Sequence, residues 1–150
     1  MATMKSKQKF IYDGHASVVF KAAGSAAITA TGVGAVLDLQ PLTQAYWDNH
    51  EIPNRELTIA VAVIASDAGN SDETYKITAE VATDSAFTVP VEVAEAVVPR
   101  GVVGAFPLVI DMDAALASCP NAAFIRTKAT LGGTTPSLQY VAWMVKGEAT

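Results

Sequence analysis

Hydrophobic and polar residues alternate along several short segments of the chain, the pattern of strands that turn one face toward a core. In LTIAVAVIA, residues 57–65, the side chains of Leu57, Ile59, Val61 and Val63 share one face. The opposite face of this segment is nearly as apolar. The sequence therefore predicts a central or covered strand here.

The longest stretch of alternation, YKITAEVATDSAFTVPVEVAEAV, runs from Tyr75 to Val97 and is broken by a polar TDS. Residues 75–82 are predicted to form a half-buried strand with one solvent-facing side, joined to the strand before it in a hairpin with an exposed loop, residues 66–73. Pro90 has no backbone N–H, so the piece after the break is placed at a sheet edge or a bulge. One buried layer is expected to contain the larger apolar residues of both strands: Leu57, Ile59, Val61, Tyr75, Ile77 and Val81.

The other segments add short strands and little helix. Strands are expected near 10–12, 17–21, 27–31, 34–39 and 105–110, and a long hairpin is expected from residues 122–131 and 138–146 around the turn GGTTPS. Asp111 or Asp113 would cap about one or two helical turns that stop at Pro120. About eight to ten short strands with turns between them indicate a β-sandwich or barrel.

Two segments depart from this pattern. Residues 1–9 are polar and carry Lys5, Lys7 and Lys9 on alternate positions, so that an extended segment would show all three on one side. Residues 40–55 form the longest irregular stretch and carry Tyr46 and Trp47. We interpret the chain as a basic arm, residues 1–9, followed by a single domain, residues 10–150.

Composition narrows the function classes. The 150 residues suit one domain, and a net charge of −5 argues against a broad nucleic-acid footprint. No apolar run reaches the roughly 20 residues needed to span a bilayer, and the first residues do not read as a secretory signal. The single cysteine, Cys119, excludes an intrachain disulfide and is expected to be a small, partly buried residue.

Candidate catalytic residues are few. His15 and His50 lie far apart in turn-like segments, where a lone histidine is usually polar surface. Asp111 and Asp113 form a spaced carboxylate pair of the kind that glycosidases use, but their position before an alanine-rich segment favours helix capping. We therefore expect no enzymatic activity.

Candidate binding residues are also sparse. The loop 66–73 contains oxygen donors suited to calcium, but it lacks the alternate spacing of an EF-hand loop and is interpreted as a solvated hairpin tip; the donors are Asp67, Asn70, Asp72 and Glu73. Folding is therefore expected to need no metal or cofactor. Aromatic residues could line a sugar-binding surface, although such residues more often fill a core or an interface; these are Tyr46, Trp47, Tyr140 and Trp143.

Four segments in this order resemble the small capsid cement, or decoration, proteins of tailed bacteriophages. The segments are residues 12–39, LTIAVAVIA at 57–65, YKITAEVATDSAFTVPVEVAEA at 75–96 and AAFIRTKATLGGTTPSLQYVAWMV at 122–145. They cover most of the chain, and each is a β pattern of low specificity. The lysine-rich arm and the stretch 40–55 depart from the resemblance.

The resemblance implies an all-β, jelly-roll-like antiparallel sandwich that binds the outer surface of a phage capsid. Its partners would be the major capsid protein and further copies of itself, a dimer being favoured over a trimer, and it would be made in the host cytoplasm. Candidate capsid or subunit contacts are Lys5, Lys7, Lys9, Tyr46 and Trp47. The alternative is a carbohydrate-binding or tail-fibre-type module in which Tyr46 and Trp47 stack on sugars.

Overall fold

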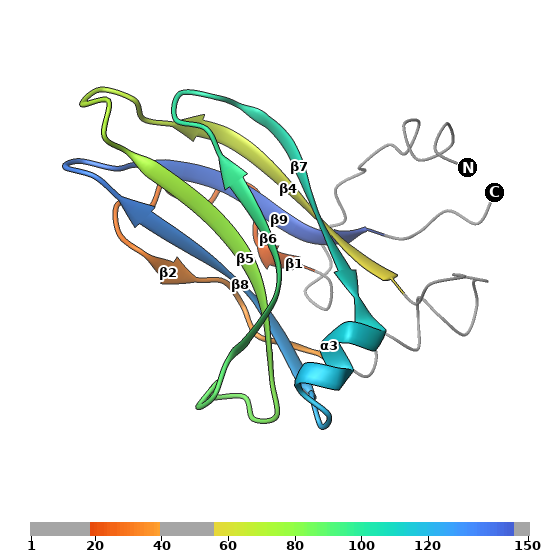
Figure 1. Ribbon diagram of the computed structural model, residues 1–150. Coiled ribbons are helices and arrows are strands. Elements are labelled where there is room, and N and C mark those ends of the chain that lie inside the picture. The colour runs from red at the N-terminus through yellow and green to blue at the C-terminus, as the bar shows by residue number, and fades with distance from the viewer. Residues whose placement is uncertain (1–18, 40–55, 146–150) are drawn as a thin grey trace.

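The computed structural model describes residues 19–39 and 56–145, which form two antiparallel sheets and one short helix (Figure 1). Sheet A has the strand order β1–β9–β4–β7, and sheet B has the order β2–β8–β5–β6, with β3 also paired to β8. The elements are β1 (Val19–Lys21), β2 (Gly32–Val33), β3 (Leu37–Asp38), β4 (Glu56–Ser66), β5 (Thr74–Ala82), β6 (Val91–Val98), β7 (Gly104–Asp111), α3 (Met112–Ser118), β8 (Phe124–Gly132) and β9 (Leu138–Val145). The expected all-β sandwich is confirmed.

The strand pairs are nested, as in one long hairpin that has been rolled up. β1 pairs with β9, β2 and β3 pair with β8, β4 pairs with β7, and β5 pairs with β6. Two further pairs join these into continuous sheets: β4 pairs with β9 in sheet A, and β5 pairs with β8 in sheet B. This is the connectivity of a jelly roll, in which strands adjacent in sequence often lie in opposite sheets.

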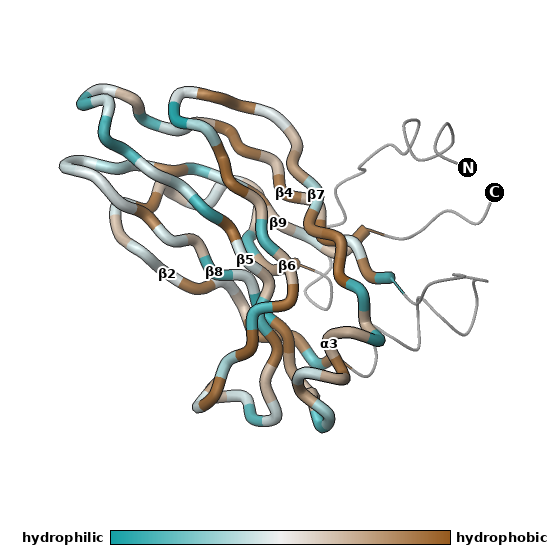
Figure 2. The backbone as a smooth tube through the Cα atoms, viewed as in Figure 1, coloured by the Kyte–Doolittle hydropathy of each residue, from teal (hydrophilic) through white to brown (hydrophobic). Residues whose placement is uncertain are grey.

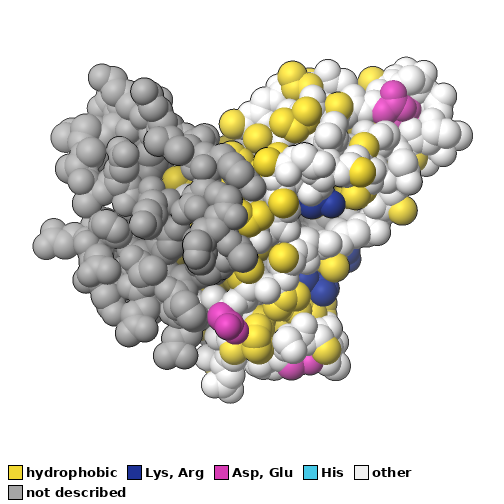
Figure 3. Space-filling model, turned by 180° about the vertical axis from the view of Figure 1, so that it is seen from behind, with side chains coloured by type: hydrophobic (Ala, Val, Ile, Leu, Met, Phe, Trp, Pro, Cys, Tyr) yellow, Lys and Arg dark blue, Asp and Glu magenta, His cyan; other side chains and the backbone are white. Residues whose placement is uncertain are grey.

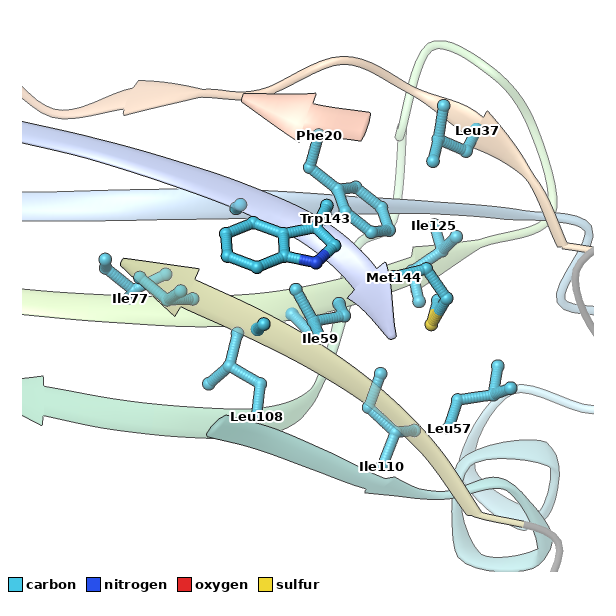
Figure 4. Packing of buried hydrophobic residues seen from close by; sticks show 14 of the residues in the cluster. Phe20, Leu37, Leu57, Ile59, Ile77, Leu108, Ile110, Ile125, Trp143 and Met144 are labelled. Atoms are coloured by element: carbon cyan, nitrogen blue, oxygen red, sulfur yellow. The ribbon is translucent and has the colours of Figure 1, made fainter. Parts of the chain in front are cut away.

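The core lies between the sheets, where apolar strand residues meet (Figure 2). Figure 4 shows Ile59 and Leu108 of sheet A among the residues packed with Ile77 and Ile125 of sheet B. The six residues predicted to share one buried layer are all at most 2% exposed: Leu57, Ile59, Val61, Tyr75, Ile77 and Val81. This prediction is confirmed, because the alternation within each strand set the buried face correctly.

Both predicted long hairpins are wrong. β4 lies in sheet A and β5 in sheet B, so residues 67–73 cross from one sheet to the other. β8 and β9 are likewise in different sheets, joined by residues 133–137. Loops of this length can span the roughly 10 Å between packed sheets. Two consecutive strands can therefore bury their apolar faces against each other across the core instead of pairing side by side.

The segment before β4 contains less strand than predicted. Residues 27–31 form no strand, and Ile28 makes only an isolated bridge to Leu138. In the segments predicted at 17–21 and 34–39, the described residues form the short strands β1 and β3, and residues 10–12 and 17–18 lie outside the described ranges. Gly34 has a reason to be glycine, because a Cβ there would lie 2.6 Å from the Phe20 carbonyl oxygen. The backbone passes close to both sheets at this point.

Three predictions in the second half of the chain are confirmed. The strand predicted at 105–110 is β7, and β6 is an edge strand of sheet B that begins directly after Pro90. The Asp111 side chain caps α3 by accepting hydrogen bonds from the backbone N–H groups of Asp113 and Ala114. Cys119 follows the helix and is 7% exposed.

Candidate binding surface

Several residues singled out in the sequence lie outside the described ranges. The candidate capsid or subunit contacts and both histidines belong to this group: Lys5, Lys7, Lys9, Tyr46, Trp47, His15 and His50. Their roles therefore stay predictions. The described residues nevertheless offer three features that bear on binding: an organised loop, two unlike sheet faces and a free sheet edge.

Tyr140 and Trp143 do not form an exposed aromatic platform. Tyr140 is 2% exposed on the inner side of β9, and burial raises the pKa of its hydroxyl. Trp143 is 5% exposed and lies on the outer side of the same strand, opposite Ala60. Of the two roles considered for these aromatic residues, burial bears out packing for Tyr140 and Trp143 and not an exposed sugar-binding surface.

The loop 66–73 uses its carboxylates to organise its own backbone. Asp67 accepts a hydrogen bond from the Gly69 N–H, and Glu73 accepts one from the Asn70 N–H at 2.7 Å. Glu73 is 2% exposed. The interpretation as a solvated hairpin tip is therefore wrong, since the loop links two sheets and buries one of its acids.

Hydrogen bonds also connect this loop to residues 133–137. The Asp72 carboxylate accepts from the hydroxyl and the N–H of Thr134, and these bonds lower the pKa of Asp72. The Asn70 amide donates to the Thr135 hydroxyl. Among the described residues no group of three or more His, Cys, Asp or Glu side chains is placed to hold a metal ion. The two loops form an ordered end of the sandwich in which the acids serve as hydrogen-bond acceptors.

The outer face of sheet B is charged, and its centre is covered. Arg126 on β8 forms an ion pair with Glu80 on β5 at 3.0 Å, with exposed side-chain fractions of 16% and 4%. The Phe87 ring lies 4.1 Å from the same guanidinium group. The solvent-facing side predicted for β5 is therefore wrong at its centre, where Thr78 is also fully buried. Aliphatic and planar parts of long side chains cover short neighbours in this way.

The loop that carries Phe87, residues 83–90, is also held by its own side chains. The Thr88 hydroxyl and N–H both donate to the Asp84 carboxylate, which lowers the pKa of Asp84. Phe87 has a φ of 52°, a left-handed conformation that is unusual for an aromatic residue. In this backbone conformation the Phe87 ring lies against the Arg126 guanidinium group.

On the outer face of sheet A, Glu56 and Asp111 are paired at one end of β4 and β7, and beyond that pair the paired residues of β4, β7 and β9 carry no outward charged side chain. Alternation from the buried inner residues places these side chains outward: Thr58, Ala60, Ala62, Ala105, Pro107, Val109, Gln139, Val141, Trp143 and Val145. Figure 3, which views the molecule from behind, shows hydrophobic side chains scattered over the rear surface, with a few Lys and Arg side chains among them. Part of this face is buried, and the part along β7 is exposed.

We call the exposed part the β7 stripe, and it consists of Ile64, Val103, Ala105, Pro107 and Val109. Val109 is 49% exposed, and at the other end of the strand Val103 and Ile64 are 61% and 53% exposed. Ile64 and Val103 lie at the same end of the β4–β7 pair, because Val63, which precedes Ile64, is paired with Gly104, which follows Val103. A contiguous row of exposed apolar residues is a typical marker of a contact surface.

No helix within the described ranges is long and apolar enough to cross a membrane. Comparison with protein-family models, with curated proteins and with solved structures finds no match to this chain. The proposals that follow therefore rest on the geometry of the described residues and on the resemblance of the sequence.

Proposed function

We propose that this chain is a structural virion protein that binds the outer surface of a phage capsid and cements neighbouring major capsid protein subunits. The resemblance of four ordered segments to capsid cement proteins supplies the class. The observation that carries the proposal is the exposed and uncharged β7 stripe on the outer face of sheet A. A cement protein acts through buried contact area and needs no reactive group.

The composition of the β7 stripe suits the centre of a protein interface. Such centres are depleted of charged residues, because desolvating a charge costs free energy that a contact seldom returns. Val103 and Val109 offer exposed branched side chains at the two ends of the stripe, with Ala105 and Pro107 between them. We assign the capsid contact to this stripe.

The arrangement of the loops supports the same proposal. Hydrogen bonds between residues 66–73 and 133–137, and within residues 83–90, fix the loops at both ends of the sandwich. A surface that is already ordered before binding loses less conformational entropy in the complex. A rigid two-sheet body can therefore span a seam between capsid subunits without first refolding.

Co-sedimentation with purified capsids tests the proposal. The double variant Val103→Lys/Val109→Lys should bind capsids roughly tenfold or more weakly, because two ammonium groups would be desolvated in the contact. The matched control is Val33→Lys/Val89→Lys, which adds the same charge away from sheet A at valines that are 51% and 71% exposed. Equal losses in the two variants would reject the β7 stripe as the contact.

A glycan array run on the same preparations addresses the alternative of a carbohydrate-binding module. The proposed function predicts capsid binding and no selective sugar binding. Selective binding of a glycan by the intact chain, with no retention on capsids, would overturn the cement proposal. Because Tyr140 and Trp143 are buried, a sugar platform would have to come from other residues.

A further inference from the structure

The edges of the two sheets are protected to different degrees. β1 has 3 residues, and β2 and β3 have 2 each, so these edges offer little backbone for pairing. β7 has 8 residues, but Pro107 interrupts its row of N–H donors. β6 also has 8 residues and contains no proline between Val91 and Val98. Among the described edges β6 is thus the longest one without a proline block.

The free side of β6 carries unused backbone hydrogen-bonding groups. Within the described residues β6 pairs with β5 alone, so alternate N–H and C=O groups point outward. The register shift between Ala79 and Glu80 places an extra residue in β6, so that Glu92 and Glu95 both lie on the outer face. Both are exposed, and Glu95 forms a long ion pair with Lys76, at 3.9 Å between Nζ and Oε2.

We propose that the edge of β6 accepts an extended basic strand, the arm of residues 1–9 from a second copy of this chain. An added strand would satisfy the outward N–H and C=O groups by β-augmentation. Lys5, Lys7 and Lys9 alternate in sequence, so an extended arm would bring all three ammonium groups to the face that carries Glu92 and Glu95. Opposite charges on neighbouring strands stabilise such pairs.

Charge also selects the arm over other strands of the same protein. Pairing β6 with β6 of another copy would bring four exposed carboxylates together, which opposes that arrangement. The arm holds three of the ten Lys and Arg residues of the whole chain within five positions. If each copy lends its arm to the other, the two contacts are equivalent and the product is a closed two-fold dimer. This inference requires no capsid and goes beyond the proposed function.

Sedimentation equilibrium of the full chain tests the inference through charge reversal. The unchanged protein should dimerise, and its dissociation constant should rise with salt. The edge variant Glu92→Lys/Glu95→Lys and the arm variant Lys5→Glu/Lys7→Glu/Lys9→Glu should each weaken dimerisation roughly tenfold or more. Combining the two sets should restore most of the affinity, because the signs are again opposite.

A matched control changes charge elsewhere on an edge strand: Asp38→Lys on β3, which should leave the dissociation constant unchanged within about twofold. Hydrogen exchange should show that β6 amides gain protection in the dimer. A chain that is monomeric at every concentration overturns the inference, and so does a combined variant that stays as weak as its parents. A monomer that still binds capsids rejects this inference alone, whereas a dimer that ignores capsids rejects the proposed function alone.

Discussion

The two sheets share one core but present unlike outer faces. Sheet B turns outward an ion pair, Arg126 with Glu80, and covers it in part with Phe87 from the loop 83–90. Apart from Glu56 and Asp111 at one end, sheet A turns outward a face without charge along β4, β7 and β9, and leaves the β7 stripe exposed. The centre of the first face satisfies its polar groups within the chain, whereas the second face keeps apolar area that a partner can bury.

This difference shows which features the fold demands and which it leaves free. Closing the sandwich needs apolar residues on the inner face of each strand, and both sheets meet that demand. On the outer face of sheet A, Ala60 and Trp143 are also buried, so it is the exposed β7 stripe that has no role in packing and calls for an explanation in binding.

The largest expected effects lie in the core that the two sheets share. Ile59→Ala in sheet A and Ile77→Ala in sheet B should each lower the free energy of unfolding by about 2–5 kcal/mol, because both side chains are fully buried. Denaturant unfolding measures both values. Losses below about 0.5 kcal/mol at both sites would mean that the two strands do not meet face to face.

The next largest effect should distinguish the outer face of sheet B. Arg126→Met removes the partner of Glu80 and should cost about 2–3 kcal/mol, somewhat below a fully buried pair because the guanidinium keeps some solvent contact. Lys128→Met on the same strand is the control and should change stability by less than about 0.5 kcal/mol. Similar losses for the two variants would remove the special role of the ion pair.

A smaller effect is expected on the outer face of sheet A. Val109→Lys should change the free energy of unfolding by no more than about 0.5 kcal/mol, because the side chain is already half exposed. Thermal or denaturant unfolding of the free protein checks this. A large loss would show that Val109 serves the fold, and the β7 stripe would then lose its assignment as a contact surface.

The smallest effect concerns the loop that covers sheet B. Hydrogen bonds from Thr88 lower the pKa of Asp84 below its ordinary 3.8. Their contribution to stability is therefore present above the unfolded pKa and is lost as pH falls through the folded pKa. Thr88→Val should raise the pKa of Asp84 toward its ordinary value, which an NMR titration of the carboxyl carbon measures. An unchanged pKa would mean that the Thr88 hydroxyl does not hold the loop in solution.

Local patterns predicted the strands better than their partners. The alternation of Leu57, Ile59 and Val61 set both the strand and its buried face, and Pro90 marked the start of an edge strand. Which strands pair is decided by contacts distant in sequence. The hairpin predicted for β4 and β5 failed because a loop of seven residues can either turn back or cross the core, and no local signal separates the two.

The candidate surfaces were predicted only in part, because they too depend on contacts between residues distant in sequence. Alternation indicated that both faces of residues 57–65 are apolar, which is the basis of the uncharged outer face. The β7 stripe was not predicted, because it needs the register that places Val109 opposite Thr58. Burial of Glu80 was also missed, since it depends on Arg126, which lies 46 residues further along the chain.

The nested pairing has a consequence for the time course of synthesis. β9 lies at the centre of sheet A, between β1 and β4, yet it is the final described strand to leave the ribosome. Until Leu138–Val145 has emerged, β4 lacks one neighbour and β1 lacks its only one. Sheet A must therefore close late, through contacts of high sequence separation that form slowly. A chain cut short before β9 would leave β1 unpaired and one edge of the apolar strand β4 open, and it would be prone to aggregate.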